Sequence, residues 1–245
     1  MRRIRGRPVA DLSGRSGWEA RLQAAVAGLQ PGQLQRLMAE IRAQANLQSV
    51  TIPESLWAEF NAETQAAITP ILEQIFIESA REAAVAYPTL AVNWALVNAQ
   101  AATWASGYAF DLVKLIDDTT RSGLQEAISA YFKTATTMGD LRTALAQFTP
   151  TIQDTLGRTL YSVNRASMIA TTEVTRAATQ GELQWAQIMH EENPDIRVVE
   201  IWQTNRDELV CPKCGPRQGK RIKGNDFPPA HPRCRCWTNT QLVGA

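Results

Sequence analysis

The stretch that decides the fold is residues 164–202, NRASMIATTEVTRAATQGELQWAQIMHEENPDIRVVEIW, because the sequence pattern changes within it. Small and apolar residues first recur at helical spacing, which predicts one helix over 164–190. The members of this stripe are Ala166, Ala170, Val174, Ala177, Ala178, Gly181, Trp185 and Ile188. Asn193-Pro194 then ends the helical part, and the β-branched run at 197–202 predicts a strand.

The region before this helix is also predicted to be helical, because Ala, Leu, Gln and Glu dominate it and Gly is scarce. Pro31 and Pro70 each predict a break between two helices. The apolar segment 90–115 predicts a central core helix, and Thr119 or Thr120 is expected to cap the next one.

Shorter elements complete the pattern. Two short helices are predicted over 141–148 and from Thr149 onward. After the strand at 197–202, residues 221–223 and 237–243 predict two further strands. The fold class is therefore mainly α, a multi-helix body followed by a small α+β region at the C-terminus.

All four cysteines lie in this C-terminal region, as CPKC at 211–214 and within HPRCRC at 231–236. A CxxC turn puts two thiolates on one side of a tight loop, and a second pair after roughly 15–20 residues completes a tetrahedral set. Such a closed set favours a structural Zn²⁺, so the region is expected to resemble a zinc knuckle. The candidate ligands are Cys211, Cys214, His231, Cys234 and Cys236. We expect Cys211, Cys214 and Cys234 to bind, with either Cys236 or His231 as the fourth ligand.

Other chemistry is less well supported by these residues. Disulfides are disfavoured by a reducing compartment, and buried free thiols by the alternating cations. Zinc deaminases combine HxE with PCxxC, but here Pro212 lies inside the CxxC, and Glu192 after His190 is a weak signal alone. Glu173 and Arg176 are expected to form a structural ion pair one helical turn apart. No nucleophile–base pair is evident, so no catalytic residue is predicted and the protein is not expected to be an enzyme.

The charges divide the chain further. We expect a basic N-terminal arm at 1–16, a helical body over 17–192 and a small β/zinc-knuckle domain over 193–245. The arm has a net charge of +4, residues 197–245 have +5, and residues 17–196 have −8. Basic ends favour an acidic partner, with solvated tails as the alternative. The expected contact residues are the basic side chains Arg2, Arg3, Arg5, Arg7, Lys213, Lys220, Arg221, Lys223, Arg233 and Arg235.

The overall composition is that of a globular protein, with 44% hydrophobic and 20% charged residues. No apolar run approaches the roughly 18 residues that a membrane helix needs, and no apolar segment follows the basic N-terminus. We therefore expect no secretory signal, no membrane partner and synthesis in the cytoplasm.

Two stretches together resemble the phage head-morphogenesis family, the Mu F-like minor head proteins. The first is MIATTEVTRA at 168–177 followed by Gly181, which is close to the family's IARTEVxRA helix and its glycine. The second runs from Trp202 to Cys236 and ends in a PPxHPxCRC pattern. Thr171 departs from the family, which usually has Arg there.

This resemblance implies a minor capsid protein of the virion, present in few copies in the head interior or at the portal vertex. Its implied partners are the portal and/or the major capsid protein, with packaged DNA as a further candidate, and its implied roles are head assembly and DNA packaging or delivery. Many members replace the first cysteine, which favours His231 as a ligand and makes Cys211 dispensable.

Two other functions compete with this reading. The basic knuckle could hold a DNA backbone while Trp202 and Trp237 stack on bases. A metal-dependent enzyme or toxin is the other alternative, and the two histidines of the chain leave it few general bases.

Overall fold

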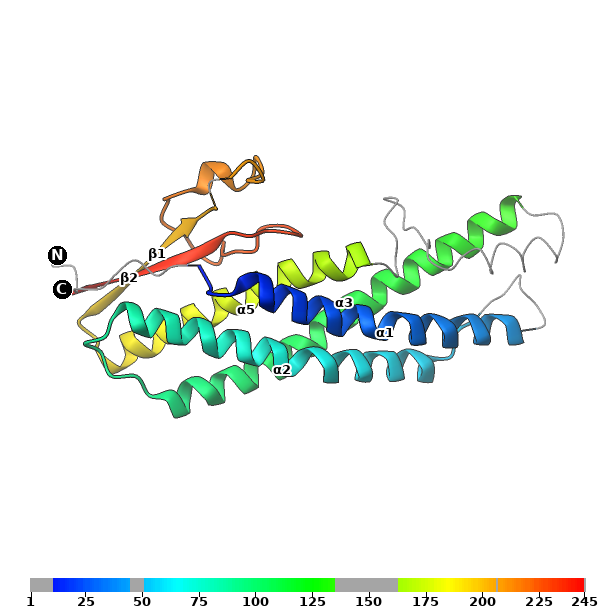
Figure 1. Cartoon of the computed structure of the whole chain (residues 1–245), viewed down its shortest axis with the longest axis horizontal. Helices are drawn as coiled ribbons and strands as arrows, with labels where there is room; N and C mark the ends of the chain where they lie inside the picture. Colours follow the sequence, from blue (N-terminus) through cyan, green and yellow to red (C-terminus); the bar gives the residue numbers. More distant parts are fainter. Residues whose placement is uncertain (1–10, 45–50, 135–162, 206, 245) are drawn as a thin grey trace. The chain divides into compact units, whose positions relative to one another are not determined.

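The computed structural model describes residues 11–44, 51–134, 163–205 and 207–244 (Figure 1). Its helices are α1 (Arg15–Ala43), α2 (Glu54–Ala86), α3 (Trp94–Thr134) and α5 (Val163–Glu192), and its strands are β1 (Ile196–Gln203) and β2 (Trp237–Gly244). The described part is thus mostly helical with a small antiparallel sheet near the C-terminus, and the predicted fold class is confirmed. None of the described helices is long and apolar enough to cross a membrane.

The helices α1 and α2 are longer than predicted, because neither proline breaks them. Pro31 lies inside α1 and Pro70 inside α2, and both side chains are exposed. The backbone carbonyl that loses its helical partner at each proline can therefore bond to water, which lowers the cost of keeping proline inside a helix. Buried residues continue on both sides of each proline, such as Val26 and Leu37 in α1. The predicted breaks at both prolines were wrong.

The helix α3 is also continuous where a cap was predicted. It begins after Asn93, whose side-chain oxygen accepts the N–H of Leu96 at 3.2 Å. At Thr120 the hydroxyl accepts a hydrogen bond from Arg165 at 3.1 Å, and the helix runs on to Thr134. The predicted start of a new helix at Thr119 or Thr120 was therefore wrong. The helices expected over 141–148 and from Thr149 fall partly or wholly outside the described residues.

The chain divides into two compact units. The first comprises residues Met1–Arg21, Pro70–Ser106 and Met168–Ala245, and the second Leu22–Thr69 and Gly107–Ser167. The boundaries expected from the sequence, at residues 16 and 192, remain predictions.

The second unit is helical in its described part. Within it, the Trp57 and Phe60 rings meet edge to face at 5.8 Å, and the guanidinium of Arg121 lies 4.7 Å from the centre of the Trp57 ring. The buried amide of Gln33 donates to the carbonyl of Phe60 and to the hydroxyl of Thr64. These contacts hold the segments of this unit together.

The first unit contains the sheet and the C-terminal loops. The predicted stripe on α5 is buried along its length, from Ala166 to Ile188. The ring of Tyr87, just after α2, stacks on Trp185 of α5 with 5.5 Å between ring centres. These two rings belong to a core that also includes Val97, Ile196 and Leu242.

The sheet consists of β1 and β2, paired antiparallel from Ile196↔Gly244 to Gln203↔Trp237 (Figure 1). The predicted strands at 197–202 and 237–243 are thereby confirmed. Residues 221–223 do not form a strand, because only an isolated bridge joins Ile201 to Arg221. Around this bridge Trp202 exchanges hydrogen bonds with the 219–220 backbone, so the loop that carries the first cysteine pair is fixed along the free edge of β1.

Candidate metal centre

Two tight turns of the same pattern carry four of the five candidate ligands. In Cys211-Pro212-Lys213-Cys214 the N–H of Cys214 donates to the Cys211 carbonyl at 3.1 Å. In His231-Pro232-Arg233-Cys234 the N–H of Cys234 donates to the His231 carbonyl, also at 3.1 Å. Each turn thus has a candidate ligand, a proline, a cation and a cysteine in order, so that its first and last side chains lie close together.

The ligand atoms of the two turns converge. Sγ of Cys211 lies 3.0 Å and Sγ of Cys214 3.2 Å from Nε2 of His231, and the sulfurs of Cys214 and Cys234 are 3.8 Å apart. Zn–S bonds of about 2.3 Å in a tetrahedron separate two sulfurs by about 3.8 Å. Cys236 belongs to a second group, with Cys214 and Cys234, whose sulfurs lie within 4.8 Å of one another. All five candidates therefore lie in one cluster.

The imidazole of His231 is oriented as a ligand. Its Nδ1 lies 2.7 Å from the carbonyl oxygen of Pro232. Because a carbonyl only accepts, this contact places the proton on Nδ1 and leaves a lone pair on Nε2, which faces the sulfurs of Cys211 and Cys214. A backbone carbonyl that fixes the histidine tautomer is a usual partner of metal-bound histidine.

The cluster has room for a metal ion. It lines a cavity of about 30 Å³ together with Asn205, Leu209 and the two knuckle arginines. Cys214, Cys234 and Cys236 are buried, whereas Cys211 and His231 are half-buried. The donor set of soft thiols and one imidazole suits zinc. The residues can thus hold a metal.

The thiols ionise unequally when no metal neutralises them. A hydrogen bond from the Cys236 thiol, opposed by burial, lowers the pKa of Cys234 to about 5. The same bond and burial raise the pKa of Cys236. Burial and the neighbouring Cys234 thiolate raise the pKa of Cys214 to about 12. Metal binding must therefore displace protons from this cluster, as thiolate ligands require.

Helix α5 holds the second turn through two threonines. The hydroxyl of Thr175 donates to the carbonyl oxygen of Cys234 at 2.7 Å, and the hydroxyl of Thr172 accepts the N–H of Arg233 at 2.9 Å. Arg233, whose N–H donates to Thr172, has a left-handed conformation with φ of 63°. Both threonines belong to the family-like 168–177 stretch, so this part of α5 supports the turn from His231 to Cys234, here called the metal loop.

Sequence reasoning did not identify these two threonines as functional. A threonine inside a helix usually bonds its own helix, as the hydroxyl of Thr172 also does to the carbonyl of Met168. Only their spacing of three residues, which puts both on one face, could have suggested a shared partner.

The predicted pair Glu173 and Arg176 lies on the same helix, with Oε2 and Nε 3.3 Å apart. The Glu173 side chain is 6% exposed and that of Arg176 37%. The nearly buried carboxylate of Glu173 thus forms an ion pair within α5. The structural role predicted for this pair stays a prediction.

The basic residues of the knuckle fall into two groups. Arg235 forms an ion pair with Asp207 at 2.8 Å, and its side chain is about one-third exposed. The remaining predicted contact residues of the knuckle are exposed: Lys213, Lys220, Arg221, Lys223 and Arg233. The predicted contacts Arg2, Arg3, Arg5 and Arg7 lie outside the described residues.

One part of the predicted nucleic-acid surface was wrong. Trp202 is only 2% exposed, and the guanidinium of Arg217 covers its ring at 4.7 Å from the centre. Arg217 is itself paired with Asp226 at 2.8 Å. Trp202 is therefore a core residue of the knuckle, packed with Cys214, and cannot stack on a base.

One comparison with known proteins gives a match. The family model described as Phage Mu protein F like protein matches residues 127–239. No curated protein and no solved structure matches the chain significantly. The matched segment contains helix α5 and all five candidate ligands, and therefore both stretches on which the resemblance was based.

Proposed function

We propose that this chain, which matches the family model of Mu F-like proteins over residues 127–239, belongs to the phage head-morphogenesis family and is a minor structural protein of a tailed-phage head. It is present in few copies, in the head interior or at the portal vertex, and binds the portal or the major capsid protein. It acts in capsid assembly or in DNA packaging and delivery. The single observation that carries this proposal is the family match, which covers both helix α5 and the metal loop that α5 supports.

The metal centre has a structural task in this proposal. Zn²⁺ would be held by Cys211, Cys214, His231 and Cys234, the ligands of the two matching turns, and would supply a closed tetrahedral crosslink. The knuckle has a small apolar core, built mainly from Trp202 and the cysteines themselves. A crosslink between its two turns therefore contributes much of its folding free energy. A closed four-ligand site supports an assembly protein rather than an enzyme.

The role in the head is tested on the virion. Quantitative mass spectrometry of purified particles should find this chain at a small fraction of the major capsid protein, and cross-linking should connect it to portal or capsid subunits. Particles made without the chain should be defective in assembly or in DNA content. Intact infectious virions and proheads that lack the chain would overturn the proposal.

The metal is tested on the purified protein. Elemental analysis of reduced protein, prepared without a metal-affinity tag, should find about one zinc per chain. Chelation should unfold the knuckle and leave most of the helical signal in circular dichroism. A metal-free protein whose thermal unfolding is unchanged by chelation would remove the zinc from the proposal and leave the family role to be decided by the virion experiment.

A second candidate function, contact with packaged DNA, is favoured by the exposed cations of the knuckle. Lys213, Lys220, Arg221 and Lys223 are exposed, and all four lie between Cys211 and His231 in the sequence. Phosphate contacts of this kind give salt-dependent binding without base specificity. The triple variant Lys220→Gln, Arg221→Gln, Lys223→Gln should weaken DNA binding and flatten its salt dependence. Unchanged binding, or none at low salt, would exclude this function.

A further inference from the structure

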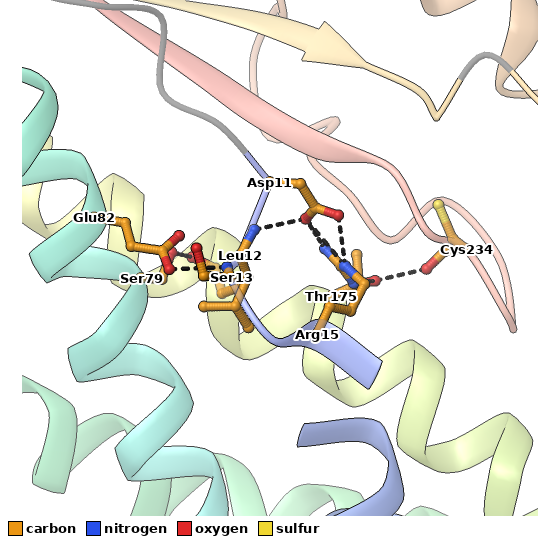
Figure 2. Close-up of polar contacts among 9 residues, drawn as sticks. Asp11, Leu12, Ser13, Arg15, Ser79, Glu82, Thr175 and Cys234 are labelled. Carbon is orange, nitrogen blue, oxygen red and sulfur yellow. Dashed lines mark hydrogen bonds and ion pairs between the residues drawn. The ribbon is translucent and has the colours of Figure 1, made fainter. Parts of the chain in front are cut away.

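The start of the described chain is fastened to the metal loop through one hydroxyl group. Residues Asp11–Arg15, here called the N-terminal latch, lie beside α2, α5 and the loop that leads to Cys234 (Figure 2). The guanidinium of Arg15 donates a hydrogen bond to the Thr175 hydroxyl at 2.8 Å. That hydroxyl donates in turn to the carbonyl oxygen of Cys234 at 2.7 Å. The latch and the metal loop therefore share one buried partner.

The donor and the acceptor are fixed in both hydrogen bonds of the Thr175 hydroxyl. A threonine hydroxyl has a single proton, and Thr175 gives it to the Cys234 carbonyl, so the Thr175 oxygen can only accept from Arg15. Thr175 is 0% exposed, and water cannot replace a lost partner there without an opening of the fold. Hydrogen bonds in such a chain polarise one another, so the loss of the carbonyl also weakens the bond to Arg15.

The rest of the latch is arranged to hold Arg15. Its guanidinium is paired with the Asp11 carboxylate, with Nε 2.8 Å from Oδ2, and its side chain is only 11% exposed. The N–H of Ser13 donates to the Glu82 carboxylate on α2 at 2.8 Å, and Leu12 is buried. An arginine at the N-terminus of a helix is unfavourable by itself, because the positive end of the helix dipole lies there. Asp11 and Thr175 offset this cost.

The position of the Cys234 carbonyl depends on the metal loop. Cys234 closes the His231 turn, and its sulfur is one of the proposed ligands. Loss of the metal frees this turn and removes the acceptor of Thr175. We propose that the N-terminal latch closes only on the formed metal centre, so that loss of the metal releases residues Asp11–Arg15. The proposal rests on the metal site of the proposed function and adds its coupling to the N-terminus.

The coupling is testable by hydrogen–deuterium exchange on the zinc-loaded full chain. The latch and the first turn of α1 contain five reporter amides with hydrogen bonds in the structure: Leu12, Ser13, Arg15, Gly17 and Trp18. Chelation with EDTA should speed their exchange about tenfold, whereas buried amides near Trp185 on α5 stay protected. Thr175→Val should give the same acceleration with zinc still bound at one ion per chain, and Thr175→Ser should restore slow exchange.

Thr179→Val is the matched control, because Thr179 lies one turn further along α5, is 2% exposed, and its hydroxyl has no hydrogen-bond partner among the described residues. It should leave latch exchange unchanged. Zinc-loaded protein whose latch amides respond neither to EDTA nor to Thr175→Val would overturn the coupling and leave the metal site standing. A purified chain without zinc would overturn both. If Thr175→Val fails to fold, the EDTA response of the native chain and the behaviour of Thr175→Ser decide the question.

Discussion

The backbone of Gly181 on α5 lies directly against the backbone of Phe76 on α2. A β-carbon built on Gly181 would be 2.1 Å from the Phe76 carbonyl oxygen and 2.8 Å from its carbonyl carbon. Real β-carbons do not approach a backbone so closely, and the obstacle is not a flexible side chain. The glycine after the family-like helix motif is thus required by a contact between two helices of the first unit.

We predict that Gly181→Ala destabilises the protein by about 3 kcal/mol or prevents folding, because α5 must move away from α2. Gly28→Ala is the control, since Gly28 is also helical and has nothing within 4 Å of the added carbon. It should stabilise by up to about 1 kcal/mol through helix propensity. Denaturant unfolding of both variants gives the comparison, and similar stabilities would show that the close contact carries no cost.

The local parts of the fold could be predicted from the sequence. The helix at 164–190, the strands at 197–202 and 237–243, and the clustering of the cysteines follow from residue spacing over a few positions. The predicted breaks at Pro31 and Pro70 were wrong because both prolines face solvent, where a helix tolerates them. Exposure is a property of the tertiary fold, and no local pattern supplies it.

The supporting contacts of the site could not be predicted either. Thr175 is 59 positions from Cys234 and 160 from Arg15, so their meeting depends on how α5 packs in the first unit. Trp202 was assigned to a nucleic-acid surface because a tryptophan among cations fits both a stacking platform and a core. Its burial under Arg217 shows which of the two it is.

The geometry of the two turns favours His231 over Cys236 as the fourth ligand, and this prediction can be tested. We expect His231→Ala to lose most of the bound zinc, because Nε2 faces two sulfurs and Nδ1 is held by a backbone carbonyl. Cys236→Ser should retain about one zinc per chain, since Cys236 lies outside both turns. Elemental analysis under reducing conditions distinguishes the two. Loss of zinc in Cys236→Ser with retention in His231→Ala would assign the ligands the other way.

The buried carboxyl of Glu182 predicts a pH dependence of stability. It accepts the N–H of Thr240 on β2 at 2.6 Å, and burial raises its pKa from 4.5 to about 8. Between these values the folded state keeps a proton that the unfolded state has lost. The free energy of unfolding therefore falls by about 1.4 kcal/mol per pH unit as the pH rises from 4.5 to 8, and this contribution is then constant.

Glu182→Gln should remove this contribution, because an amide oxygen can still accept from Thr240 and does not ionise. The variant should gain stability relative to the native chain as the pH rises toward 8, and denaturant unfolding at several pH values measures the difference. A constant difference between the two proteins over this range would contradict a raised pKa for Glu182.

The hydroxyl of Tyr87 closes the outer edge of β2. It accepts the N–H of Leu242 at 3.1 Å and lies 3.2 Å from the carbonyl oxygen of Thr240, to which it donates. Tyr87→Phe keeps the ring on Trp185 but leaves these two buried backbone groups unpaired, so we expect a loss of about 2 kcal/mol. The Leu242 amide should also exchange faster, because the Tyr87 hydroxyl that accepts its hydrogen bond is removed. Thr103→Ala removes an exposed hydroxyl that bonds only within α3, and should change stability by less than about 0.5 kcal/mol. Equal stability of the two variants would mean that Tyr87 holds β2 through its ring alone.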